Sequence, residues 1–552
     1  MNKLKSIIMG GIAVLALASC SDDQYNEFYN NPNEVTKAPC ATLFTATLYD
    51  KDGRDYTFNQ YWRVYTWDNI FGKYAQTCGY ANNSGNVYFY NDGYANDRWN
   101  GFYRRLAQFR QLENTYANED PSAQANDLIL KDLAEVFIID HATQIADLFG
   151  DTPYSKAGML GITNDIVSSR AAFDDDVEIY RNAINRLGEL YTEIESLKGT
   201  LSDNVKSTLI AGQDFINRDV AGDDALYHLI DRWLMYANSL RLRLAVRVAL
   251  NGELAAFGQS AIKECMNRQL VTDAYDQIEV RSDEDGFNFW ENFRDGYKDI
   301  NNVASQPMID AMQRVEGEND YRLPVIYTPN AEGKYIGTNR EETNGFQTEH
   351  GSSFNGFGNI PSYENRYYAH LEIATFTGNR LFISPIISAA EVWFLRAEAY
   401  QRGWASGNAE DAFTNGMIES TKWYYKQNNM YAAAKDEAKS GGVATHYTYP
   451  GDEAVRTYAS KLWNTYDEKL EGILTQKWVN FGIIQPQQAW NDIRRTGYPA
   501  LSYPTDTQAQ NMKELPNRMM YPNTEKANNR ANYDAVVGVQ GDDAYTKLFW
   551  AK

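Results

Sequence analysis

The sequence predicts a mostly α-helical protein, built on helical hairpins, with an irregular loop-rich face and a few short strands. Apolar residues recur at helical spacing between Asp223 and Leu250, which predicts a long amphipathic helix. Two further helix-like segments follow each other between Ser388 and Tyr425, which predicts a hairpin. Two segments rich in Gly, Asn and Tyr interrupt the helical pattern and predict the loops.

The first residues of the chain resemble a targeting signal rather than part of the fold. Two lysines precede the apolar run Ile7–Ala18, which is too short to cross a bilayer, since spanning takes about 20 apolar residues. The run ends in the letters LASC, which resemble the bacterial lipobox, whose cysteine is acylated. We therefore expect a signal peptide over residues 1–19 and lipidation at Cys20.

An acidic cluster, SDD, follows Cys20 directly and resembles the export signal of Bacteroidetes surface lipoproteins. A solvated tether would have the same composition, so the cluster is open to both interpretations. We expect residues 20–38 to form a lipidated tether on the extracellular face of the outer membrane. Residues 39–552 are then expected to form a single domain, with 43% apolar residues for its core.

The composition excludes several classes of function. A net charge of −21 argues against nucleic-acid binding, which requires a basic surface. Beyond Cys20, three cysteines remain at wide spacing, so the sequence has no disulfide framework or zinc pattern, and we expect them to be buried. No sequence pattern indicates a cofactor or a metal centre. Carbonyl-rich loops could hold a structural Ca²⁺, although the chain has no EF-hand loop.

The helical pattern is most regular in segments spread along the whole mature chain. In the hairpin, Ser388 and Glu391 stand in capping-box order, Gly403 is placed to end the first helix, and small residues sit where the two helices would cross. This spacing resembles a tetratricopeptide-type helix pair, although no strict 34-residue repeat is visible. Further helices are predicted over Thr57–Gln76, Arg98–Asn118, Ala123–Phe149, Asp175–Leu197 and Thr465–Phe481.

The two irregular segments are Cys78–Trp99 and the region from Asp283 to about Tyr368. Hints of short strands occur around Val325–Tyr327 and Lys334–Ile336. Long irregular segments within a domain commonly carry function, so we expect the ligand here. Tyrosine is abundant, at 39 residues, and pairs an apolar ring with a polar tip, which suits a surface that holds sugars or peptides.

Several motifs, taken in order, resemble the SusD/RagB family of nutrient-binding outer-membrane lipoproteins, in its SusD-like branch. The resemblance covers essentially the whole mature chain. The motifs are NPNEVT (Asn31–Thr36), DLFGDTPYSKA (Asp147–Ala157), WLMYANSLRLRLAVRV (Trp233–Val248), DYRLPVIY (Asp320–Tyr327), AAEVWFLRAEAYQRGW (Ala389–Trp404), TQKWVNF (Thr475–Phe481), AWNDIRRTGYP (Ala489–Pro499) and NRMMYPNTEKANN (Asn517–Asn529).

The resemblance implies a scaffold of helix pairs, a loop face for the ligand, and no catalytic residues. It also implies a partner, a SusC-like TonB-dependent transporter, over which the lipoprotein acts as a hinged lid. By their own chemistry, Gly150 and Pro153 predict a structural turn. Arg494 and Arg495 can bind carboxylates or backbone carbonyls, and buried ion pairs are the favoured expectation.

The ligand candidates are aromatic and polar residues of the irregular segments, placed by region and not by alignment to a family site. The loop Cys78–Trp99 resembles by position the family's first ligand-contacting segment. The candidates are Tyr88, Tyr90, Asp92, Tyr94, Trp290, Phe293, Arg294, Tyr297, Glu364, Arg366 and Tyr367.

Three functional classes remain open on the sequence alone. Capture of an oligosaccharide for import is favoured over capture of an oligopeptide, because the loops are rich in Tyr and Asn. A surface glycoside hydrolase would need two carboxylates about 5–10 Å apart, and with 73 acidic residues chance pairs carry no information. A helical scaffold for protein assembly would have no ligand pocket in the loop face.

Overall fold

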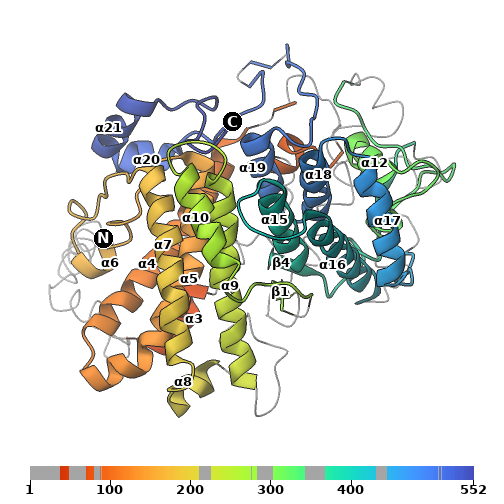
Figure 1. Cartoon of the computed structure of the whole chain (residues 1–552). Helices are drawn as coiled ribbons and strands as arrows, with labels where there is room; N and C mark the ends of the chain where they lie inside the picture. The colour runs from red at the N-terminus through yellow and green to blue at the C-terminus, as the bar shows by residue number, and fades with distance from the viewer. Residues whose placement is uncertain are drawn as a thin grey trace, which may run out of the picture.

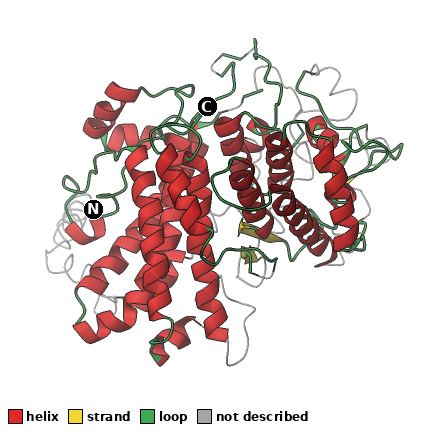
Figure 2. Cartoon of the chain, viewed as in Figure 1, coloured by secondary structure: helices red, strands yellow, loops and turns green. Residues whose placement is uncertain are grey.

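Helices make up most of the described structure, which confirms the predicted fold class (Figure 2). The computed structural model describes residues 38–48, 70–79, 87–88, 90–209, 225–274, 276–281, 303–341, 367–430, 444–507, 509–510 and 512–552. None of the helices in these ranges is both long and apolar enough to cross a membrane.

The first half of the chain forms a group of long helices that lie side by side (Figure 1). Within this group α5 packs on α4 and α7, α7 packs on α9, and α9 packs on α10. The members are α3 (Cys40–Leu48), α4 (Asp92–Ala117), α5 (Pro121–Phe149), α7 (Asp176–Leu197), α9 (Ala225–Val248) and α10 (Ala255–Cys265), with the short helices α6 (Leu160–Thr163) and α8 (Asp203–Thr208).

The second half forms another helical group beside the first, and α15 joins the two groups through its contacts with α9 (Figure 1). Helix α15 packs on α16 and α18, and α16 packs on α17. The members are α12 (Gln306–Met312), α13 (Leu323–Ile326), α15 (Ala389–Gln401), α16 (Ala409–Met430), α17 (Asp452–Asn464), α18 (Lys469–Phe481) and α19 (Pro486–Thr496). The last helices of the chain, α20 (Asn523–Asn528) and α21 (Arg530–Gln540), lie over one end of the first group.

The predicted hairpin is α15 and α16. Ser388 caps α15, because its hydroxyl accepts a hydrogen bond from the Glu391 amide at 3.1 Å. The Glu391 side chain does not complete a capping box, since it pairs with Arg243 instead. Gly403 follows the helix in the left-handed region, with φ of 71°. At the crossing, a Cβ on Gly416 would lie 2.8 Å from the ring of Phe394, so only glycine permits this approach.

Polar caps and glycine fix the ends of the long helices in the first group. The Asp120 carboxylate accepts hydrogen bonds from the first turn of α5, and Pro121 opens that helix. Gly150 ends α5 with φ of 80°, as the turn prediction required. Asp175 caps α7 in the same way as Asp120 caps α5.

The strands differ from the prediction. The segment Val325–Tyr327 begins inside α13, and the only strand there is β2 (Tyr327–Thr328), paired with β3 (His370–Leu371). Residues 334–336 are a loop, because the chain there follows the turn at Gly333 and makes isolated bonds rather than a ladder. A second antiparallel pair, which the sequence analysis did not predict, joins β1 (Ile278–Arg281) to β4 (Ile383–Ile387).

The long predicted helices are confirmed within a few residues of their ends, except Thr57–Gln76, most of which lies outside the described residues. Helices α10, α17 and α19 were not predicted. Most side chains of α19 are polar, yet the helix is buried along its whole length, so its sequence does not resemble that of a core helix.

Candidate ligand-binding site

The loop before α4 is attached to the C-terminal part of the chain by the hydroxyl groups of its tyrosines. Tyr88 donates a hydrogen bond to the carbonyl of Pro504 at 2.6 Å, and Tyr90 donates to the carbonyl of Met520 at 3.2 Å. Tyr88 is buried, with 1% of its surface exposed, and this burial raises the pKa of its phenol to about 12. Its ring therefore packs the loop down, whereas Tyr90 remains partly exposed.

The predicted loop Cys78–Trp99 is shorter than expected, because α4 begins at Asp92, so the candidates Asp92 and Tyr94 lie on the helix. Asn91 caps the helix by accepting from the Gly93 amide at 2.8 Å. Asp92, the first helical residue, accepts from the amide of Asn523 at 3.3 Å, which joins α4 to α20. Asp92 and Tyr94 are both half-buried, so each keeps part of its side chain at the surface.

Tyr367 is the one candidate of the second irregular segment that lies among the described residues. It is half-buried, its ring stands edge-on to Tyr368 at 5.0 Å, and its carbonyl accepts from Asn330 at 2.7 Å. Cys20 and the candidates Trp290, Phe293, Arg294, Tyr297, Glu364 and Arg366 lie outside the described residues.

The segment 327–341, which is part of the second irregular segment, also contacts the first one, a link that the sequence analysis missed. Asn330 binds the backbone at Tyr367, and Arg340 donates to the carbonyl of Val87 at 2.9 Å. Tyr503, from the C-terminal part of the chain, donates to the carbonyl of Tyr74 at 2.8 Å, just before the first irregular segment. The only signal for Tyr503 was the repeated Tyr-Pro pairs after Gly497, which indicate extended loop.

The family-like motif around Arg494 and Arg495 belongs to the scaffold, as predicted. Arg495 makes two hydrogen bonds of 2.7 Å to the Glu398 carboxylate, and a third of 3.0 Å to Asp492. Arg494 instead donates to the backbone carbonyls of Asn517 and of Asp147, at 2.6 and 2.9 Å. All these side chains are buried, so none of them can contact a ligand.

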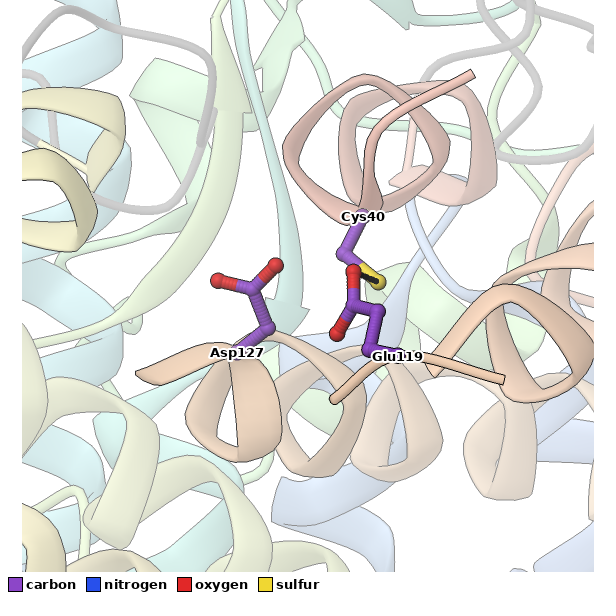
Figure 3. Close-up of side chains that lie close together, drawn as sticks. All are labelled: Cys40, Glu119 and Asp127. Atoms are coloured by element: carbon purple, nitrogen blue, oxygen red, sulfur yellow. Dashed lines mark hydrogen bonds between the residues drawn. The ribbon is translucent and has the colours of Figure 1, made fainter. Parts of the chain in front are cut away.

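The three cysteines beyond Cys20 are free and buried, as expected. The Cys40 thiol donates a hydrogen bond to Glu119 at 3.2 Å, with Asp127 beside them (Figure 3). Burial, with the neighbouring carboxylates, raises the pKa of Cys40, and burial also raises the pKa of Glu119 and of Asp127. A thiol that keeps its proton is a poor metal ligand, so this trio is best explained as an anchor of α3 on the α4–α5 hairpin.

A second acidic cluster lies between the C-terminal end of α5 and the N-terminal end of α7. It consists of Asp151, Asp175 and Asp176, whose carboxylate oxygens lie within 4.8 Å of one another. Asp175 caps α7, and Asp151 accepts from the Asp176 amide at 3.0 Å. Burial, followed by the charges of Asp151 and Asp175, raises the pKa of Asp176 to about 8.

This shift predicts a pH-dependent stability. An unfolded aspartate has a pKa of about 3.9, so between about pH 4 and 8 only the folded chain keeps the proton, and stability falls as the pH rises. Asp176→Asn removes this loss, so it should raise Tm more at pH 8 than at pH 5 in thermal melts. The fully exposed Asp203 gives the control, since Asp203→Asn should change Tm alike at both pH values. An equal change for Asp176→Asn would contradict the pKa assignment.

Two cavities open among the described helices. One, of about 390 Å³, lies between α5 and α7, with Ile139 and Ala183 among its apolar lining and Tyr154 at its wall. The other, of about 650 Å³, lies between α9, the segment after α10 and α15. We call it the α9–α15 cavity; its lining includes His228, Met235, Met266, Arg268, Asp276 and Arg396. Both volumes fall in the range of small-ligand sites.

The fold thus defines a class of protein in which packed helix pairs form a scaffold and irregular segments connect them. The sequence profile of the SusD-like family, described as "Susd and RagB outer membrane lipoprotein", matches residues 27–551. The chain therefore belongs to the SusD-like family.

Solved structures show the same fold. A chitin-binding protein matches with a TM-score of 0.67 at 22% identity, over 93% of this chain and 99% of that one. A SusD homolog from Bacteroides fragilis matches with a TM-score of 0.68 at 16% identity, over 93% and 100%. A chitin-binding SusD homolog from Flavobacterium johnsoniae matches with a TM-score of 0.61 at 18% identity, over 93% and 98%. A search of the curated proteins found no significant match.

Proposed function

We propose that the protein is a surface lipoprotein of the outer membrane that captures oligosaccharides and delivers them to a SusC-like TonB-dependent transporter. The observation that carries this proposal is the family match over residues 27–551, whose description names outer membrane lipoproteins. The LASC sequence ending at Cys20 supports the lipid anchor, and SDD after it supports export to the extracellular face.

The choice of an oligosaccharide over an oligopeptide is supported from two directions. Two of the solved structures with the same fold are chitin-binding proteins. In this chain, Tyr90, Asp92 and Tyr94 each keep part of their surface exposed, and the Asp92 carboxylate acts electrostatically on the Tyr90 phenol. A tyrosine ring can pack on the apolar face of a sugar while neighbouring polar groups bind its hydroxyls.

Tyr90 gives the sharpest test of the site. Tyr90→Ala removes the ring, so it should weaken oligosaccharide binding at least about tenfold in calorimetry, which corresponds to about 1.4 kcal/mol. Tyr90→Phe keeps the ring and loses only the bond to Met520, so it should keep most of the affinity.

Tyr545→Ala and thermal melts are the controls for this test. Tyr545 is an exposed tyrosine elsewhere in the chain, at 41% exposure, and Tyr545→Ala should leave binding unchanged. Thermal melts of each variant separate a lost contact from a lost fold. Unaltered affinity in Tyr90→Ala, together with unaltered affinity in Trp290→Ala, would remove the irregular segments from the site.

The same experiment decides between the remaining functional hypotheses. An oligopeptide ligand would give heat with peptides and none with sugars, and it would be bound through main-chain hydrogen bonds. A hydrolase would release shorter products during incubation, whereas a binding protein returns its substrate unchanged. Co-purification with a TonB-dependent barrel tests the partner independently of the ligand.

A further inference from the structure

The α9–α15 cavity carries two arginines whose guanidinium groups are stacked on aromatic rings. Arg396 lies 4.0 Å from the ring centre of Trp393, and its Nε donates to the Tyr400 hydroxyl at 3.1 Å. Arg268 lies 4.6 Å from the ring centre of Tyr191. Stacking fixes the plane of each guanidinium, so its remaining N–H groups keep a set direction.

Neither of these arginines forms an ion pair with a carboxylate of the described residues. Arg268 donates to the Gly188 carbonyl at 2.9 Å and to the Thr192 hydroxyl at 3.1 Å, both of which are neutral. Arg396 has the Tyr400 hydroxyl as its hydrogen-bond acceptor within the described part of the chain. Arg243 of the scaffold differs, since it is bound by the Glu391 carboxylate. With 73 acidic residues available, the two cavity arginines still keep donors for an external anion.

Two aspartates, Asp231 and Asp276, line the same cavity. Asp231 is paired with Lys198 at 2.6 Å. Asp276 is half-buried, and this burial raises its pKa. Exposed His228 faces the same cavity and can accept or donate a hydrogen bond. The cavity therefore offers guanidinium groups for an anion and polar groups suited to hydroxyls.

We propose that the α9–α15 cavity is a second ligand site, which binds the carboxylate of an acidic sugar unit. Arg396 and Arg268 supply the donors for the carboxylate, and Asp276 and His228 bind the hydroxyls of the ring. Met235 and Leu270 line the cavity with apolar surface, against which the C–H groups of the sugar pack. This site is separate from the loop face of Tyr90, so its test does not depend on the oligosaccharide proposed there.

Calorimetry with a trisaccharide of galacturonic acid, against the corresponding neutral galactose trisaccharide, tests the proposal on the mature chain. We expect binding of the acidic trisaccharide at least about tenfold tighter than that of the neutral one, and weaker binding as salt increases. Equal affinity for the two sugars would overturn the proposal. An acetylated tripeptide with a free C-terminal carboxylate forms a second arm; binding of this peptide without binding of the acidic sugar would overturn the sugar assignment.

Arg396→Gln assigns the binding to this cavity and should weaken it at least about tenfold. Arg314 is the matched control, because it is also stacked on a ring, that of Tyr466 at 3.8 Å, and binds the neutral Thr465. Arg314→Gln should leave the affinity unchanged, and an equal loss in both variants would contradict the assignment. If Arg396→Gln fails to fold in a thermal melt, Arg268→Gln carries the same expectation.

Discussion

Arg495→Met should lower the free energy of unfolding by about 3–5 kcal/mol, because it removes the buried, doubly hydrogen-bonded partner of the Glu398 carboxylate. Arg495 binds Glu398 through both of its terminal nitrogens, with side-chain exposures of 1% and 0%. Its loss also removes one of the two cations beside Asp492, whose other partner is Lys477 at 2.9 Å. Denaturant unfolding, followed by circular dichroism, measures the effect.

Arg402 supplies the control for this prediction. It binds the same Glu398 carboxylate at 2.9 Å, but it is partly exposed and can be replaced by water. Arg402→Met should therefore cost at most about 1 kcal/mol. If Arg495→Met and Arg402→Met lowered the free energy of unfolding equally, burial of the ion pair would not decide its contribution to stability.

Asp147→Ala should cost a similar amount, about 3–5 kcal/mol, because Asp147 neutralises a cation inside the helix scaffold. Its carboxylate accepts hydrogen bonds from Arg247 and Tyr180, and from Asn491 at 2.9 Å. These donors come from α9, α7 and α19, so one side chain joins three helices to the end of α5. Removing it leaves Arg247 buried without a carboxylate.

Tyr180→Phe is a milder substitution in the same cluster, and its loss of stability can be compared with that of Asp147→Ala. Tyr180→Phe removes one donor to Asp147 and leaves the ion pair with Arg247, so about 2 kcal/mol is expected. Thermal and denaturant unfolding of the two variants should rank Asp147→Ala well below Tyr180→Phe in stability. The reverse order would contradict the role of Asp147 as the charge partner.

The long helices could be predicted from the sequence because each local signal agreed with the tertiary structure. The cap at Ser388 and the turn at Gly150 are both where the sequence places them. The capping box also predicts that the Glu391 side chain binds the start of α15. This part of the prediction is wrong, because Glu391 binds Arg243, 148 positions away in the sequence. No local pattern contains such a partner, and the same holds for the pairing of β1 with β4.

The candidate site could be predicted by region, but the direction of each side chain could not. Tyr88 and Tyr90 stand two positions apart and look equivalent in the sequence, yet Tyr88 is buried on Pro504 and Tyr90 is partly exposed. Their partners come from the C-terminal segment, over 400 positions away. Trp393 and Tyr400 stand at helical spacing from Arg396 in the sequence, but the cavity that Arg396 lines is completed by α9 and by the segment after α10, over 100 positions away.

Capture of an oligosaccharide, without cleavage, is the central claim, and titration calorimetry of the mature chain tests it most directly. The titrants are a chitin oligosaccharide, other neutral oligosaccharides and length-matched peptides, with the sugars recovered afterwards and sized. The account predicts heat with at least one neutral oligosaccharide, none with the peptides, and recovery of the sugar at its original length. Heat with the peptides alone, or shortened sugars, would contradict it.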